Sequence, residues 1–160
     1  MRPEVERGWR IREAGTADIP AMHEVRLAVR ENVLSSPGRV TPAMYHDYLT
    51  VQGKGWLCET AEGELLGFSV ADARDGSIWA LFVRPGREGQ GIGRALLQLA
   101  CDWLFACGHP AVSLSTGVGT RADRFYADCG WEREAQPQGR EVSYILPAWR
   151  HQKAWPSRAS

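Results

Sequence analysis

Residues 77–107 constrain the fold more than any other part of this sequence. An apolar run, Ser77–Val83, ends at Pro85-Gly86 and is followed by a loop with glycines at 89, 91 and 93. Apolar side chains then recur at intervals of three and one, at Ile92, Ala95, Leu96, Leu99, Ala100, Trp103, Leu104 and Cys107. This spacing predicts a long amphipathic helix that ends at Gly108. A strand that leads through a glycine loop into such a helix is typical of proteins that combine helices with a sheet.

The sequence before residue 77 predicts a strand, two helices and two more strands. Trp9–Glu13 alternates apolar and charged residues, as a strand does. Thr16 is the preferred cap of a helix whose apolar stripe runs from Ile19 to Val33, before Pro37-Gly38. Thr41-Pro42 begins a second helix, predicted to reach about Gln52 and to end at the glycines that follow.

Three short apolar runs then predict an antiparallel meander of strands at 56–60, 65–71 and 77–83. The segments between them, Glu62-Gly63 and Asp75-Gly76, are hairpin signals. After the long helix we expect a strand at 111–116, a helix at 120–129 and strands at 131–134 and 141–146. The prediction is therefore one α/β (α+β) domain over 1–160, with about seven strands in a mixed sheet and about four helices. Its core is expected at about 9–146, with a polar tail at 147–160.

Composition excludes several classes of protein. The 19 basic residues equal the 19 acidic ones, which argues against nucleic-acid or anionic-membrane partners. No apolar run is long enough to span a membrane, and residues 1–6 do not resemble a signal peptide. The four cysteines lack C-x-x-C spacing and have no histidine near them, so we expect buried free thiols in a cytoplasmic protein and no metal site.

The glycine loop predicts a site for an anion. Glycines let a ligand approach the backbone, and the first N–H groups of the following helix lack partners within the helix. These amides and the helix dipole suit a phosphate or pyrophosphate. The dinucleotide pattern G-x-G-x-x-G fails, because Leu96 or Arg94 stands at the sixth position. The phosphate loop G-x-x-x-x-G-K-[ST] fails as well, since Tyr48 stands where its first glycine belongs.

A third pattern fits. Leu81-Phe82-Val83-x-Pro85, leading into Gly89-Gln90-Gly91-Ile92-Gly93-Arg94-Ala95, resembles motif A of the Gcn5-related N-acetyltransferase (GNAT) family, which binds the pyrophosphate of acetyl-coenzyme A. Phe125-Tyr126-x-x-Cys129-Gly130-Trp131 resembles motif B of the same family. The order of elements agrees with that family from about residue 9 to 146. Glu88 departs from motif A, which has Gln or Arg there, and Ser77–Val83 lacks the glutamate that serves as general base in many relatives.

The resemblance implies a direct transfer of acetyl from acetyl-coenzyme A to an amine of a small molecule, amino acid or protein. It implies a cofactor site with the peptide groups of Phe82 and Val83 on the pantetheine arm and a loop on the pyrophosphate, formed by Gln90, Gly91, Ile92, Gly93, Arg94 and Ala95. Tyr126 matches the family tyrosine and is the predicted catalytic acid for the thiolate leaving group. Acceptor-binding candidates are Glu31, Asn32 and Asp72.

The general base stays open among Glu31, His46, Asp72 and Glu141. The acceptor also stays open. An alternative is a module of the same fold that binds coenzyme A without catalysis, as a sensor or partner of another protein. A nicotinamide oxidoreductase is disfavoured by the failed glycine spacing. Exposed strands near the C-terminal edge and Trp149 and Trp155 favour a homodimer.

Overall fold

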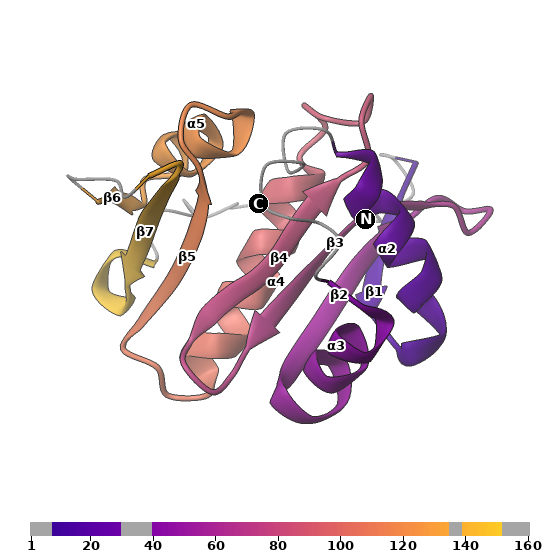
Figure 1. Ribbon diagram of the computed structural model, residues 1–160, viewed down its shortest axis with the longest axis horizontal. Coiled ribbons are helices and arrows are strands. Elements are labelled where there is room, and N and C mark those ends of the chain that lie inside the picture. The colour runs from indigo at the N-terminus through magenta and orange to yellow at the C-terminus, as the bar shows by residue number, and fades with distance from the viewer. Residues whose placement is uncertain (1–7, 30–39, 135–138, 152–160) are drawn as a thin grey trace.

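The computed structural model describes residues 8–29, 40–134 and 139–151. They form a seven-stranded mixed sheet in the order β1-β2-β3-β4-β5-β7-β6 (Figure 1). The strands are β1 (Arg10–Glu13), β2 (Gly53–Glu59), β3 (Leu65–Asp72), β4 (Ser77–Val83), β5 (Ala111–Gly117), β6 (Glu132–Arg133) and β7 (Glu141–Pro147). The helices are α2 (Ile19–Ala28), α3 (Pro42–Asp47), α4 (Ile92–Ala106) and α5 (Arg121–Asp128). This confirms the predicted fold class and the meander β2-β3-β4.

Two apolar clusters lie on opposite faces of the sheet. α4 covers one face, and α2 and α3 cover the other (Figure 1). Every residue of β3 is buried, because β3 is central in the sheet and helices cover both of its faces. The 3,1,3,1 spacing of α4 turns Ile92, Leu96, Ala100 and Leu104 inward, and Leu97, outside that series, is buried beside them. Within the described ranges, no helix is long and apolar enough to cross a membrane.

The first helical region differs from its prediction. α2 ends at Ala28, and Val29 has an extended backbone, so the helix does not reach Val33. Leu27, counted in the apolar stripe, is 54% exposed. The second helix is α-helical only to Asp47, and residues Tyr48–Gln52 form a π-helical turn.

The two glycines after this turn belong to β2 and do not stop the helix. Gly53 pairs with Asp72 of β3. A side chain at Gly53 would bring its Cβ to 1.7 Å from the carbonyl oxygen of Ala71. The glycine is therefore required by close contact between strands, a long-range constraint that has the same sequence signature as a helix end.

The cysteine prediction is correct for three of the four side chains. Cys58, Cys101 and Cys129 are buried free thiols, whereas Cys107 is exposed. Cys107 is the C-cap of α4, one residue past the last helical position, so it no longer follows the buried face of the helix.

Candidate active site

The two parts of the sheet separate between β4 and β5. These strands run parallel and pair only at Ser77 and Ser113, whereas β5 pairs with β7 along seven residues. Beyond Ser77, the edge of β4 that faces β5 therefore has peptide groups free of any strand ladder. A cleft lies along this edge.

A β-bulge at Trp79 accompanies this separation. The pairing passes from Ala80 opposite Val70 to Ile78 opposite Ala71, so Trp79 is the extra residue of β4. A bulge bends its strand and increases the local twist. It also places two consecutive side chains, Trp79 and Ala80, against the cluster under α2 and α3, while Ile78 packs against the α4 cluster.

The cleft draws its lining from both parts of the sheet. One wall is formed by Arg26 of α2 and by residues Ile78–Phe82 of β4. The other is formed by Leu114–Gly117 of β5, Ala122 and Tyr126 of α5, and Arg140 and Glu141. Its volume is about 210 Å³, below the roughly 300–1,000 Å³ typical of sites for drug-sized ligands. The cleft suits an extended arm or a small polar group.

At the end of β4 the glycine loop leaves the start of α4 open. Gly91 is the N-cap in a left-handed backbone conformation, with φ +85°, and no side chain caps the helix. The amide of Ala95 donates to the carbonyl of Gly91 at 3.0 Å, so it is already used within the helix. The amides of Ile92, Gly93 and Arg94 precede it, and the first turn of a helix offers such groups to a ligand.

Glu88, which stands where motif A has Gln or Arg, makes a hydrogen bond within its own loop. Its carboxylate accepts a hydrogen bond from the backbone N–H of Gly86 at 3.0 Å. Gly86 and Gly89 both have positive φ angles, so the loop turns tightly on either side of Glu88. Glu88 thus stabilises the loop, and its carboxylate is bound to a turn N–H.

The two predicted β4 contacts differ in where their peptide groups face. Arg84 donates its N–H to Leu66 of β3 at 2.7 Å. Peptide groups alternate sides along a strand, so those of Phe82 also face β3 and those of Val83 face the cleft edge. The carbonyl oxygen of Phe82 indeed lies beside Gly67 of β3, where an added Cβ would be 2.7 Å from it. Phe82 contributes its ring to the cleft wall.

Tyr126 lines the cleft from α5 and is 5% exposed. Its ring packs against Phe125, Trp131 and Tyr144, with ring centroids 5.2–5.7 Å apart. Burial, together with the nearby Cys101 and Cys129 thiols, raises the pKa of its hydroxyl far above the ordinary value. The phenol therefore keeps its proton at any ordinary pH, which a hydrogen-bond donor must do.

A buried carboxylate that the sequence analysis did not identify holds α5 in place. Asp123 accepts two hydrogen bonds from Arg133 of β6, each at 3.0 Å, and one from the hydroxyl of Tyr144 of β7 at 2.6 Å. It also accepts one from the N–H of Gly119 at 2.8 Å. These bonds, with Arg133 first, hold the pKa of Asp123 well below its usual range. The pattern Thr120-x-x-Asp123 resembles a capping box and was the available signal.

The base and acceptor candidates fall in different places. Glu31 and Asn32 lie outside the described residues. His46 is exposed on α3. Asp72 is buried and receives three hydrogen bonds from Arg74, which lower the pKa of this carboxyl. Glu141 lines the cleft.

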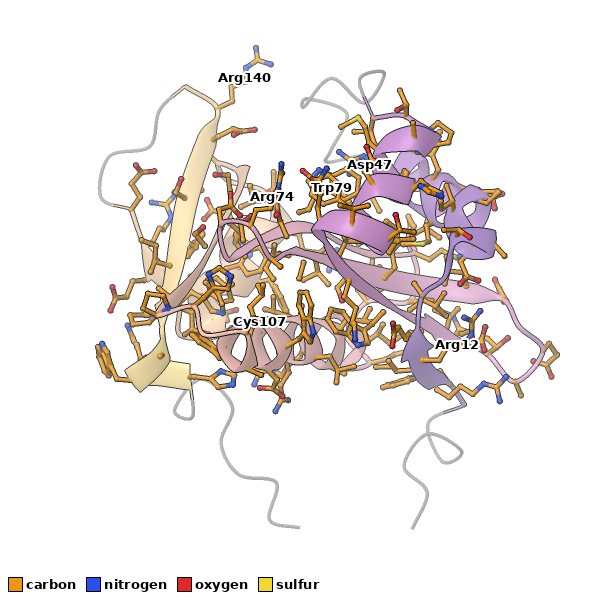
Figure 2. The ribbon with its side chains drawn as sticks, turned by 90° about the horizontal axis from the view of Figure 1, so that it is seen from below. Arg12, Asp47, Arg74, Trp79, Cys107 and Arg140 are labelled. Atoms are coloured by element: carbon orange, nitrogen blue, oxygen red, sulfur yellow. The ribbon has the colours of Figure 1, made fainter. Side chains whose placement is uncertain are left out.

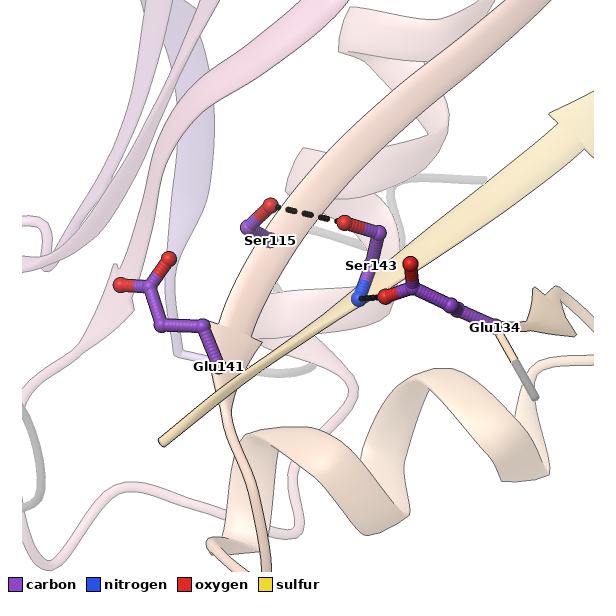
Figure 3. Close-up of a pocket in the computed structure, with 4 residues that line it drawn as sticks. All are labelled: Ser115, Glu134, Glu141 and Ser143. Carbon is purple, nitrogen blue, oxygen red and sulfur yellow. Dashed lines mark hydrogen bonds between the residues drawn. The ribbon is translucent and has the colours of Figure 1, made fainter. Parts of the chain in front are cut away.

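Glu141 also borders a second, more polar hollow across β5 and β7. Figure 3 shows its four lining residues, with Ser115 and Ser143 joined through their hydroxyls at 3.2 Å. The carboxylate of Glu134 accepts the N–H of Ser143 at 3.0 Å. Among the described residues, Ser115 and Glu141 line both hollows.

Two cleft residues were missed or assigned elsewhere. Arg26 interrupts the buried face of α2, four residues after Met22. An arginine at such a position was the sequence feature that could have identified it as a functional residue. Trp79 lies within the apolar run Ser77–Val83, which predicts a strand, and its side chain is half-buried and lines the cleft. Its ring stacks on Tyr48 at 4.2 Å, and Arg74 lies over Tyr48, so Arg74 and Trp79 appear together in Figure 2.

Known proteins share this fold and sequence pattern. The family model described as "Acetyltransferase (GNAT) family" matches residues 20–131. The chain is 26% identical over 151 residues to the peptidyl-lysine N-acetyltransferase YiaC of Escherichia coli, a match that covers 87% of this chain and 92% of that protein. An 81-residue stretch is 40% identical to mycothiol acetyltransferase of Beutenbergia cavernae; it covers 48% of this chain but only 27% of the length of that relative.

A solved structure has the same arrangement of elements. The PaiA N-acetyltransferase of Thermoplasma acidophilum, in complex with coenzyme A, superposes with a TM-score of 0.69 at 16% identity. The match covers 87% of this chain and 98% of that chain. At this identity the likeness concerns the fold.

Proposed function

This chain belongs to the acetyltransferase (GNAT) family, and we propose that it transfers acetyl from acetyl-coenzyme A directly to the amine of a small molecule, amino acid or protein. The observation that carries the proposal is the cleft along the free edge of β4, the strand whose chain continues through the glycine loop into the uncapped start of α4. An extended pantetheine arm fits such an edge, and a pyrophosphate fits such a helix start.

We assign the cofactor as follows. The peptide groups of Val83, with Leu81 on the same side of the strand, pair with the amides of the pantetheine arm. The backbone amides of the loop and first helical turn, Gln90–Arg94, bind the pyrophosphate, and Gly91 supplies the left-handed turn. Phe82 forms part of the wall beside the arm.

The chemistry needs a neutral amine and a leaving thiolate. The amine nitrogen attacks the thioester carbonyl carbon, the C–S bond breaks, and the ammonium proton passes to a base or to water. Among the base candidates, we propose Glu141, because it lines the cleft beside β5. The Tyr126 hydroxyl donates a hydrogen bond to the departing sulfur, which lowers the barrier to bond breaking.

Cofactor binding is tested at Gly93. A Cβ at Gly93 would lie 3.5 Å from Val83 and 3.7 Å from Phe125, which are ordinary contacts, so Gly93→Ala should fold. The branched side chain of Gly93→Val extends over the amides of the first turn and should weaken acetyl-coenzyme A binding at least tenfold by calorimetry. Unchanged affinity in a folded Gly93→Val protein contradicts the assignment.

Turnover is tested by thiol release from acetyl-coenzyme A with a panel of amines. Release that depends on the amine supports the enzyme. Thermal stabilisation by acetyl-coenzyme A without any release supports the alternative, a binding module of the same fold. The proposed homodimer is a separate question that sedimentation at tens of micromolar answers, and a monomer there contradicts it.

A further inference from the structure

An unpaired cation faces the cleft from α2. The Arg26 guanidinium lies over two aromatic rings of the cleft wall, with its carbon 4.9 Å from the Phe82 centroid and 5.9 Å from that of Trp79. Its Nε atom is buried and has no hydrogen-bond partner. Arg26 itself lines the cleft, so the charge is turned toward the space that a substrate would occupy.

The described part of the chain supplies no anion for this charge. In residues 8–29, 40–134 and 139–151, no carboxylate forms an ion pair with Arg26. Its polar neighbour is the hydroxyl of Tyr45, which stays neutral because burial raises its pKa to about 12. Other arginines near buried carboxylates are paired: Arg74 with Asp72 and Arg133 with Asp123. A partly buried cation without a counter-charge carries a desolvation cost, and a bound anion would offset that cost.

The rings restrict which part of the guanidinium a ligand can reach. The guanidinium carbon lies over the rings of Phe82 and Trp79, so a ligand in the cleft would bind the N–H edge of the group. That edge offers parallel donors whose spacing fits the two oxygens of a carboxylate. The cleft is small, which favours a compact planar anion.

Arg26 lies on the other side of β4 from the cofactor loop. α2 covers one face of the sheet, and α4, whose start follows the loop, covers the opposite face (Figure 1). The ring of Phe82 packs toward α2, whereas Val83 packs toward α4. Arg26 thus approaches the cleft from the face opposite the one on which the pyrophosphate is assigned.

We propose that Arg26 binds a carboxylate of the acceptor, so that the substrate is an amine that also carries a carboxylate, as an amino acid does. This inference rests on the proposed acetyltransferase function and names its substrate class. Polyamines fit poorly, because their second cation would face the guanidinium.

The test compares α-amino acids with their amides, which keep the amine and lose the charge. Wild-type protein should acetylate the acid with a kcat/KM at least tenfold higher than the amide, as expected for a charge-assisted bond. Arg26→Gln should bring this ratio close to one while the KM for acetyl-coenzyme A stays the same. Arg10→Gln is the matched control, since Arg10 lies on β1, three strands from β4, and should leave the ratio unchanged.

A binding measurement covers the case in which turnover is slow. In the presence of coenzyme A, N-acetylglycine should stabilise the wild-type protein against heat more than N-acetylglycinamide does, and Arg26→Gln should remove the difference. The proposal is overturned if the wild-type protein shows no preference for N-acetylglycine over N-acetylglycinamide, whether both probes bind or neither does. It is also overturned by an Arg26→Gln protein that loses coenzyme A affinity and keeps the acid-to-amide ratio, because Arg26 would then serve the cofactor. Failure of acetyl-coenzyme A to bind wild-type protein would instead contradict the proposed function.

Discussion

The two parts of the sheet on either side of the cleft are held in different ways. The part formed by β1–β4 is covered by α2 and α3 over a cluster of apolar side chains, with Met22, Val25, Tyr45, Phe68 and Val70 fully buried. The part formed by β5–β7 packs against α5 through the rings of Tyr126 and Tyr144, and the carboxylate of Asp123 adds directional hydrogen bonds to this contact. A single backbone pair joins β4 to β5, although the α4 cluster packs against both parts.

The two kinds of contact constrain the positions of side chains to different degrees. Apolar packing depends on buried area and tolerates small shifts, whereas hydrogen bonds to a carboxylate fix direction and distance. The first part presents a strand edge to the cleft. The second presents the proposed catalytic side chains Tyr126 and Glu141, and the Tyr126 hydroxyl must be correctly placed to act as a donor. The region with directional bonds is the one that positions the predicted catalytic group.

The largest expected effect comes from removing that hydroxyl. Tyr126→Phe keeps the ring contacts with Phe125, Trp131 and Tyr144 and loses the donor. We expect kcat to fall by about 10²–10⁴-fold, with the affinity for acetyl-coenzyme A nearly unchanged and the melting temperature close to wild type. Steady-state kinetics with calorimetry measures this. Full activity in the Phe variant would mean that Tyr126 only packs.

Next comes a cavity in the apolar part. Leu57 of β2 is 1% exposed in the α2–α3 cluster. Leu57→Ala should lower the free energy of unfolding by about 2–5 kcal/mol, through lost burial and the cavity left behind. Urea denaturation measures the loss. A cost below about 1 kcal/mol would contradict tight packing in this part.

A smaller effect is expected at the carboxylate of the other part. Asp123→Asn weakens the bonds to Arg133 and Tyr144 and should lower the free energy of unfolding by about 1–3 kcal/mol. It should also lower kcat, because α5 carries Tyr126. Asp128→Asn, at the exposed end of the same helix, is the matched control and should change little. If the two variants lowered kcat and the free energy of unfolding equally, Asp123 would have no special role in positioning α5.

The same carboxylate gives a pH dependence. The folded pKa of Asp123 is lowered, with Arg133 as the main cause, so its stabilising effect is complete above the unfolded value of about 3.9. The effect is lost as the pH falls from there toward the folded pKa. The stability difference between wild type and Asp123→Asn should therefore be constant from pH 5 to 7 and shrink below about pH 4, as measured by denaturation at each pH.

The smallest effect is expected at the hollow of Figure 3. Ser115→Ala removes an exposed hydroxyl pair with Ser143 and should change the free energy of unfolding by no more than about 0.5 kcal/mol. Activity should stay close to wild type. Because Ser115 also lines the cleft, a large loss of activity with unchanged stability would indicate that its hydroxyl contacts a substrate.

Local patterns determined most of the fold. The 3,1,3,1 spacing predicted α4 to within one residue, and hairpin signals predicted the meander, because these features depend on period and on turn chemistry. The glycine loop and Phe125-Tyr126 indicated the family, which the family model confirms. Their residues are contiguous in the chain, so their meaning does not depend on distant partners.

The contacts between residues that are distant in the sequence were decided only by the tertiary structure. The sequence predicts that Gly53 ends a helix. In the structure this position requires glycine because a Cβ there would collide with the carbonyl oxygen of Ala71 in the neighbouring strand. Trp79 belongs to a predicted strand and reaches the cleft because a β-bulge turns it to the face of Ala80. Asp123 meets Arg133 and Tyr144 only when α5, β6 and β7 assemble. Once α2 packs over β4, Arg26 has no carboxylate partner among the described residues. The sequence could not indicate this, because it gives the number of charges and folding alone sets which of them meet.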